Sequence, residues 1–269
     1  MRTMNHQTSL PPLATAPSTK PSRSMPNEAT TAMTLAIRSK DVSQAAGLID
    51  AGFPADHVNI NGESLLHFAA STADMPEMAR MLIGRGADVE CRSDKGRTPL
   101  TTAAEFERVG LAAVLLEEGA HPDAPGESGW LPLRFAMEHG GLAPVLRVLL
   151  EGGASLVQLR KSMQIPALHY CVDRRNHEGL TMLLEFGEEP RTPHARTHEN
   201  ALVYAERMHL QHKTPNSLGV RNPSYKITQK IITTLKAWMD CQNAKEAIED
   251  LVRDQSQSKL PVLEKRAKP

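Results

Sequence analysis

Five glycines recur along this chain with a nearly constant step. Gly52, Gly86, Gly119, Gly153 and Gly187 lie 34, 33, 34 and 34 residues apart. Two large apolar residues stand three and four positions before each of them, as in Leu48-Ile49 and Leu115-Leu116. A period of this length predicts a series of similar small units. No unit can bury its apolar face alone, so stability must come from stacking.

A second row of residues keeps the same step, and all its members are small. The row consists of Ala36, Ala69, Ala103, Ala136, Cys171 and Ala205. We interpret each unit as two helices. The first helix opens at a pair such as Thr98-Pro99, where proline loses no hydrogen bond. The second helix presents its apolar pair to the core and ends at the glycine, which can adopt a left-handed conformation.

Short motifs inside the units carry a family resemblance. Thr98-Pro99-Leu100 with Ala103 matches the pattern T-P-L-H-x-A, of which 64–69, 131–136 and 166–171 are variants, and 82–88 matches L-L-x-x-G-A-D. On these motifs the chain resembles the ankyrin repeat family over about residues 30–205. The resemblance implies an all-α ankyrin-repeat solenoid of about five to six helix-turn-helix repeats with short hairpin-like turns. An aromatic content of only 4% also favours short helices over a β-sandwich.

The period divides the chain into repeats and flanking segments. The predicted repeats are 30–61, 62–95, 96–128, 129–163 and 164–199. Residues 200–253 form a degenerate capping repeat with a long loop. Its final helix is amphipathic, because Ile231, Leu235 and Trp238 recur at helical spacing. Residues 254–269 are predicted to be a disordered basic tail.

The N-terminal segment 1–29 has the composition of a disordered tail. Thirteen of its first 27 residues are Ser, Thr or Pro, and none is acidic. This composition resembles the export signals of bacterial type III secretion effectors, a class in which ankyrin arrays occur. Two interpretations stay open, an export signal into a host cell and an ordinary disordered terminus.

Composition limits the environment and the partners of the protein. The chain lacks both a run of about 18 apolar residues and a secretory signal peptide, which predicts a soluble, cytoplasmic protein with no membrane partner. The formal charge is +2 over 1–29, −7 over 30–199 and +5 over 200–269. An acidic body disfavours nucleic acid and favours a partner protein with a basic surface, unless the charge is only ordinary solvated surface. We expect a monomer.

No pattern of catalytic or metal-binding residues is present in the sequence. We therefore expect neither an enzyme, nor a cofactor, nor a metal. The resemblance implies that His67 and His169 hydrogen-bond the backbone of the adjoining turn. The cluster of His194, His198, His209 and His212 lacks cysteine companions and regular spacing. Cys171 is expected to be buried and inert, and Cys91 to be exposed.

The resemblance also implies where a partner would bind, namely on turn tips and first helices along the concave face. These positions are Glu63, Ser71, Thr72, Lys95, Arg97, Glu105, Phe106, Ser128, Trp130, Glu138, His139, Met163, Asp173 and Arg174. Phe106, Trp130 and Met163 are the apolar exceptions among them. For Trp130 two interpretations stay open, an exposed binding hot spot and packing against an adjacent turn.

Two functions of different class follow. The first is a non-enzymatic interaction module, with a secreted effector as its specific form. The second is an adaptor or targeting subunit in which residues 200–269 carry a second binding or enzymatic activity. The packing of 227–252 discriminates between them, because a buried apolar stripe makes this helix a cap and an exposed one makes it a partner helix.

Overall fold

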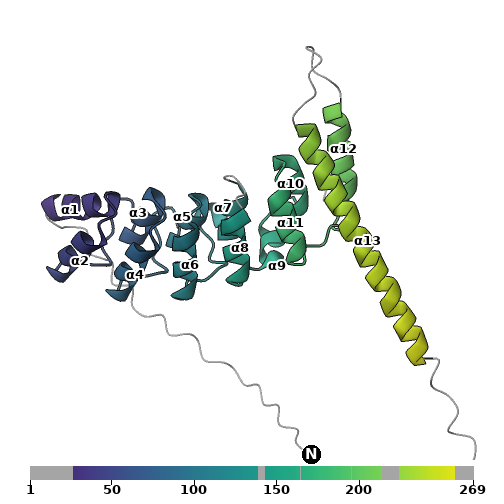
Figure 1. Cartoon of the computed structure of the whole chain (residues 1–269). Coiled ribbons are helices and arrows are strands. Elements are labelled where there is room, and N and C mark those ends of the chain that lie inside the picture. Colours follow the sequence, from purple (N-terminus) through teal and green to yellow (C-terminus); the bar gives the residue numbers. More distant parts are fainter. Residues whose placement is uncertain (1–26, 139–142, 164, 195, 214–223, 258–269) are drawn as a thin grey trace, which may run out of the picture.

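The computed structural model describes residues 27–138, 143–163, 165–194, 196–213 and 224–257. Within these ranges the fold is helical, and the only β-type pairing is an isolated bridge between Val58 and Ser64. Figure 1 shows helix pairs stacked side by side in a row, with a longer helical hairpin at the C-terminal end. The predicted all-α solenoid is thereby confirmed.

Six helix pairs build this row. The first helices of the pairs are α1 (Asn27–Arg38), α3 (Leu65–Thr72), α5 (Pro99–Glu105), α7 (Pro132–Glu138), α10 (Ala167–Arg174) and α12 (Ala201–Lys213). The second helices are α2 (Val42–Asp50), α4 (Pro76–Gly84), α6 (Val109–Glu117), α8 (Ala143–Glu151), α11 (His177–Glu185) and α13 (Ser224–Gln257). A 3-10 turn, η1 (Glu127–Gly129), and a short helix, α9 (Leu156–Ser162), lie between pairs.

Local sequence explains where the helices begin and end. Ser64 and Thr98 cap α3 and α5 with side chains that accept from the backbone three residues on, and Pro99 occupies the first turn of α5. Behind the second helices, the five periodic glycines have φ values of 105°, 94°, 93°, 92° and 89°. This is the left-handed region predicted for them, which glycine enters without steric cost.

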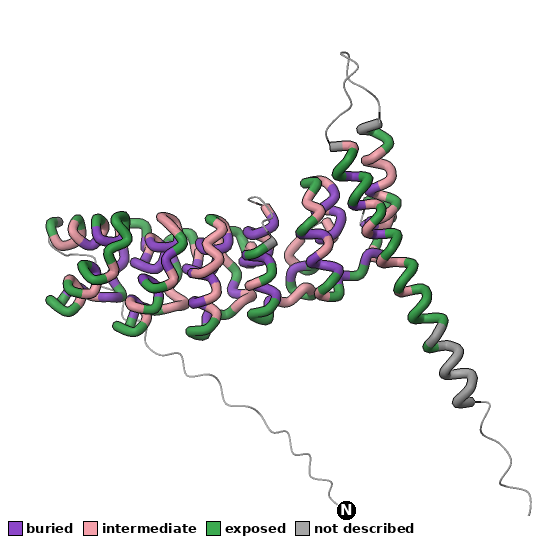
Figure 2. The backbone as a smooth tube through the Cα atoms, viewed as in Figure 1, coloured by how far each residue is buried: buried purple, intermediate pink, exposed green. Residues whose placement is uncertain are grey.

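The core lies between the two layers of helices and runs the length of the array. The first helices contribute Leu66, Leu100, Leu133 and Leu168, each at most 1% exposed. The second helices contribute Leu82, Leu115, Leu149 and Leu183, all at 0%. Figure 2 shows buried segments in every helix pair along the row. Burial is therefore shared between neighbouring units, as the period predicts.

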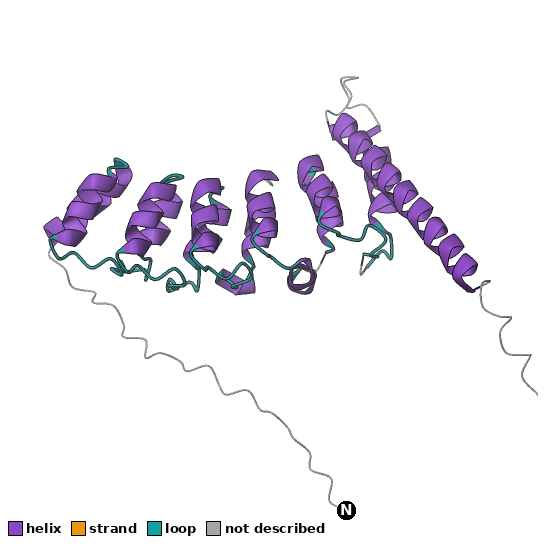
Figure 3. Ribbon diagram, turned by 60° about the horizontal axis from the view of Figure 1, so that its bottom comes forward, coloured by secondary structure: helices purple, strands orange, loops and turns teal. Residues whose placement is uncertain are grey.

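The connection between the fourth and fifth pairs differs from the prediction. The sequence pattern predicts a hairpin-like turn there, but residues 156–162 form α9, capped by the Ser155 hydroxyl, which accepts from the amide of Gln158 at 3.3 Å. Leu159 is fully buried and holds α9 on the core. Figure 3 shows α9 among the loops on the side where the other connections run.

The C-terminal hairpin packs on the end of the array. Helix α13 contacts both α11 and α12, and its Ile231 and Leu235 are fully buried. Arg191, in the loop before α12, also donates to Glu246 at 2.7 Å and to Asn243 at 2.5 Å on α13. The predicted apolar stripe is thus a packing surface. Helix α13 runs to Gln257, four residues beyond the predicted end of the cap at 253.

The ends of the chain are described only in part. Helix α1 begins at Asn27, inside the segment 1–29 that was predicted to be a disordered tail. Residues 1–26 and 258–269, on which the predictions of disordered tails rest, lie outside the described residues. Among the helices that the structure describes, none combines the length and apolarity needed to cross a bilayer.

Candidate protein-binding face

The first helices place equivalent residues side by side in two rows. In the first row, which we call the aromatic row, four of the six residues are aromatic: Leu35, Phe68, Thr102, Phe135, Tyr170 and Tyr204. In the second row, which we call the charged row, five of the six residues are charged: Arg38, Ser71, Glu105, Glu138, Asp173 and Arg207. Members of the charged row follow those of the aromatic row by three residues, so the two rows share one side of each helix. Together with Phe106, which ends α5 and is 40% exposed, they form what we call the first-helix face.

Hydrogen bonds join neighbouring pairs across this face. The hydroxyl of Tyr170 donates to Glu138, 32 residues earlier, and the hydroxyl of Tyr204 donates to Asp173, 31 residues earlier, at 2.5 Å. Burial, with the adjacent carboxylate, raises the pKa of each tyrosine to about 12, so both remain donors at neutral pH. Sequence reasoning missed both tyrosines, although their spacing of 34 residues could have revealed them.

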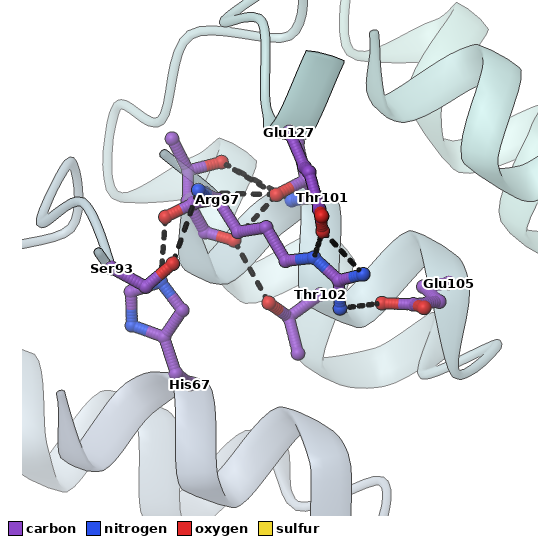
Figure 4. Close-up of polar contacts among 8 residues, drawn as sticks. His67, Ser93, Arg97, Thr101, Thr102, Glu105 and Glu127 are labelled. Atoms are coloured by element: carbon purple, nitrogen blue, oxygen red, sulfur yellow. Dashed lines mark hydrogen bonds and ion pairs between the residues drawn. The ribbon is translucent and has the colours of Figure 1, made fainter. Parts of the chain in front are cut away.

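Arg97 fixes the turn between the second and third pairs. Figure 4 shows its guanidinium between two carboxylates, with Nε 2.9 Å from Glu127 and Nη1 2.5 Å from Glu105. The side chains of Arg97 and Glu105 are only 24% and 14% exposed. Both residues were predicted to be partner contacts on an open surface. Instead, the structure commits most of their hydrogen-bonding groups to each other and to Glu127.

The two signature histidines bridge neighbouring units, as the resemblance implies. His67 Nε2 lies 2.9 Å from the carbonyl oxygen of Arg97, and His169 Nε2 lies 2.9 Å from that of Glu199. Burial lowers the pKa of both imidazoles below the usual value. Their structural role is therefore confirmed.

Trp130 is a packing residue. Its ring is half-buried against the core, 5.4 Å from the ring centroid of Phe135, and the Arg134 guanidinium stacks 3.8 Å from its centroid. Arg134 in turn donates to the carbonyl of Ser162, at the end of α9, at 2.9 Å. Of the two interpretations left open for Trp130, local packing accounts for this geometry.

The other predicted contacts divide between turns and helices. At the turns, Lys95 and Ser128 are exposed, Glu63 accepts from Asn59 at 2.8 Å, and Met163 is half-buried where α9 ends. On the helices, the hydroxyls of Ser71 and Thr72 both donate to the carbonyl of Phe68, at 3.0 and 2.7 Å.

Phe106 is 40% exposed, and Arg174 donates to Glu138. His139 lies outside the described residues.

Arginines lie over aromatic rings on the first helices and on the turns beside them, which the sequence did not reveal. The pairs are Arg38 with Phe68, Arg97 with Phe135, Arg108 with Phe106, Arg134 with Trp130, Arg174 with Tyr170 and Arg207 with Tyr204. Each guanidinium carbon lies between 3.8 and 6.0 Å from its ring centroid. Stacking of this kind stabilises the cation while leaving its edges able to donate.

More of the negative charge of the body lies on the second helices than on the first helices. Helices α2, α4, α6, α8 and α11 carry six carboxylates, Asp50, Glu77, Glu117, Glu151, Glu178 and Glu185, against two arginines, Arg80 and Arg147. Helices α1, α3, α5, α7 and α10 carry four acidic and three basic residues. The charge balance of the first-helix face therefore gives no reason to expect a basic partner there.

The described residues contain no group of three or more His, Cys, Asp or Glu side chains placed to hold a metal ion. His194 instead stacks on Tyr204, and His209 lies 2.9 Å from the Thr228 hydroxyl. Burial raises the pKa of the Cys171 thiol to about 12, which keeps it protonated and unreactive. Cys91 is half-buried rather than exposed, and its pKa is also raised by burial.

Comparison with known proteins agrees with the geometry. Residues 66–159 match the family model described as ankyrin repeats, in three copies. The chain is 33% identical over 105 residues to the nuclear factor NF-kappa-B p105 subunit of Mus musculus, which covers 38% of this chain and 11% of the relative. It is 36% identical over 97 residues to the B-cell lymphoma 3 protein homolog of Mus musculus, covering 36% and 21%.

A third relative is named for an activity. The ADP-ribosylation factor GTPase-activating protein AGD2 of Arabidopsis thaliana is 37% identical over 83 residues, which is 31% of this chain and 11% of that protein. The chain thus spans between about a tenth and a fifth of the length of these curated relatives.

Proposed function

Because this chain is an ankyrin repeat protein, we propose that it is a non-enzymatic module that binds a partner protein through its first-helix face. Ankyrin repeats indicate protein–protein interaction, so the general class follows from the repeats. The proposal adds the place of binding and the absence of catalysis.

One observation carries the proposal, the bonding between neighbouring first helices. Because the bonds of Tyr204 with Asp173 and of Tyr170 with Glu138 hold side chains in fixed positions, a partner meets a face that is already ordered. A preorganised face loses little conformational entropy when it binds. The named activity of the plant relative is not transferred, since the match covers only 11% of that protein.

A capture experiment with the full chain tests the proposed face. Ser71→Arg with Phe106→Ala alters the face at half-buried and 40%-exposed positions. Glu77→Arg with Val157→Ala is the matched control, at exposed positions on α4 and α9. We expect a partner that wild type and control retain and the face variant loses. Equal retention by all three chains would contradict the proposal.

The specific form of the proposal is a secreted effector, supported only by the composition of residues 1–29. Fusing these residues to a reporter and comparing its export from secretion-competent and secretion-deficient type III strains tests this form. We expect export from the competent strain alone. Equal amounts of reporter outside both strains would contradict the effector form. The proposal would then be a module that binds its partner inside the producing cell.

The rival function places a second activity in residues 200–269. The burial of Ile231 and Leu235 against the array supports a cap instead. A chain ending at residue 200 should then lose stability rather than a separable activity.

A further inference from the structure

The polar side chains of the first-helix face do not all find their hydrogen-bond partners in the same way. In the last three pairs, polar groups bond one another, as Tyr204 does with Asp173 and Arg207 with Glu199 at 3.0 Å. In the second pair, by contrast, the hydroxyls of Ser71 and Thr72 donate to the backbone carbonyl of Phe68, at 3.0 and 2.7 Å.

Two arginines connect the first three pairs, of which the first and the third each carry an exposed apolar side chain. Leu35 is 59% exposed and Phe106 is 40% exposed. The Arg38 guanidinium carbon lies 5.8 Å from the ring centroid of Phe68, which connects the first pair to the second. Arg108 lies 6.0 Å from the ring centroid of Phe106 and donates to the carbonyl of Ala70 at 3.0 Å. We call these residues the N-terminal patch: Leu35, Arg38, Phe68, Thr72, Phe106 and Arg108.

The charge of the N-terminal patch is positive. Arg38 stands where the later pairs have Glu105, Glu138 and Asp173, and no ion pair of Arg38 exists within the described part of the chain. Arg108 bonds carbonyl oxygens, of Ala70, Ser71 and Thr72, rather than a carboxylate. Of the carboxylates near the patch in sequence, Asp41 caps α2 and Glu105 is held by Arg97, while Glu107 lies between Phe106 and Arg108.

We propose that the N-terminal patch binds a partner segment that combines apolar side chains with carboxylates. This inference rests on the proposed function and names the chemistry of its partner. Apolar side chains of the segment would cover Leu35 and Phe106, which removes their exposed carbon from water. Its carboxylates would meet the guanidinium of Arg38, and such charge-assisted hydrogen bonds favour acidic over basic segments.

Selection from a random peptide library displayed on phage, against the full chain, tests this chemistry without choosing a sequence in advance. We expect enriched peptides that contain apolar residues flanked by Asp or Glu. Their synthetic, fluorescently labelled forms should bind at least tenfold more weakly to Leu35→Ser with Phe106→Ser, and likewise to Arg38→Glu. The matched controls are Val203→Ser, which is 46% exposed on α12, and Arg175→Glu, which is exposed at the end of α10. Both controls should bind like wild type.

Three results would overturn the inference. They are enrichment of Lys- or Arg-rich peptides, enrichment of no peptide, and equal binding of the enriched peptides to patch variants and controls. Failure of the proposed function looks different, because the captured partner would then be retained by Ser71→Arg with Phe106→Ala. If Ser71→Arg with Phe106→Ala loses the captured partner but the library enriches basic peptides, the proposed face stands and only the preference for acidic segments is rejected. Circular dichroism of each variant separates lost binding from lost folding.

Discussion

Tyr204 on α12 donates a 2.5 Å hydrogen bond to Asp173 on α10, a residue 31 positions earlier in the chain. The bond fastens the C-terminal hairpin to the pair before it. We expect a coupling energy of about 1 kcal/mol between the two side chains, the usual net value of such a bond. A double-mutant cycle of Tyr204→Phe and Asp173→Ala in urea unfolding measures it. A coupling energy near zero would mean that water replaces the bond without cost.

Glu188 is a buried carboxylate where three earlier repeats have alanine, at 87, 120 and 154. Its residue is 0% exposed and neither oxygen accepts a hydrogen bond, although Arg160 Nε lies 3.4 Å away. We expect Glu188→Ala to stabilise the protein by about 1–3 kcal/mol, the usual cost of an unsatisfied buried polar group. Burial raises the pKa of this carboxyl, so its penalty grows as the pH rises above the usual carboxyl range.

Glu188→Ala should therefore raise the free energy of unfolding by more at pH 8 than at pH 4.5, as measured by chemical unfolding. Arg160→Gln is the companion variant. It should destabilise the chain by leaving the carboxylate without its cation, and it should have no effect in the Glu188→Ala background. A destabilised Glu188→Ala protein would show instead that the ion pair outweighs the cost of burial.

The signature histidines should make the array sensitive to mild acid. Burial lowers the folded-state pKa of His67 and His169 from 6.5. The unfolded chain then binds these protons more readily, so stability is complete above about pH 6.5 and is lost as the pH falls below it. Thermal unfolding between pH 7.5 and 5 measures the loss. His67→Thr with His169→Thr, which copies Thr101 at the equivalent position of the third repeat, should reduce the slope.

Alanine substitutions at Trp130 and Phe106 should differ in their cost in stability, because Trp130 packs on its neighbours and Phe106 is exposed. Trp130→Ala removes a half-buried ring that touches Phe135 and Arg134, and we expect a loss of about 2–3 kcal/mol, below the value for a fully buried tryptophan. Phe106→Ala removes a ring that is 40% exposed and should cost under about 1 kcal/mol. Urea unfolding followed by circular dichroism compares them. Similar losses would place both rings in the core.

Two neighbouring glycines should respond in opposite directions to alanine. Gly86 has a φ of 94°, so Gly86→Ala should destabilise the chain by about 1 kcal/mol through backbone strain. Gly84 ends α4, and an added Cβ there meets nothing within 4 Å. Gly84→Ala should stabilise by about 0.5–1 kcal/mol through helix propensity. Thermal unfolding of the two variants checks the pair, and a loss at Gly84 would contradict it.

The sequence by itself determined the repeating architecture. The step of the glycines and of the small residues sets the length of each unit, and caps such as Ser64 and Thr98 set where helices start. These signals are local, because helix capping, glycine conformation and apolar periodicity act within about ten residues. The stripe of Ile231 and Leu235 predicted the packed side of α13 for the same reason.

Only the tertiary structure decided which side chains meet between units. Tyr170 with Glu138 joins two first helices and Arg97 with Glu127 joins two turns, so their geometry depends on how far each unit is rotated against the next. Trp130 packs from a turn onto Phe135 of α7. Residues 156–162 likewise form α9 rather than a turn because the core has room to bury Leu159. Local propensity does not specify these offsets, because they are set by the close packing of all neighbouring side chains together.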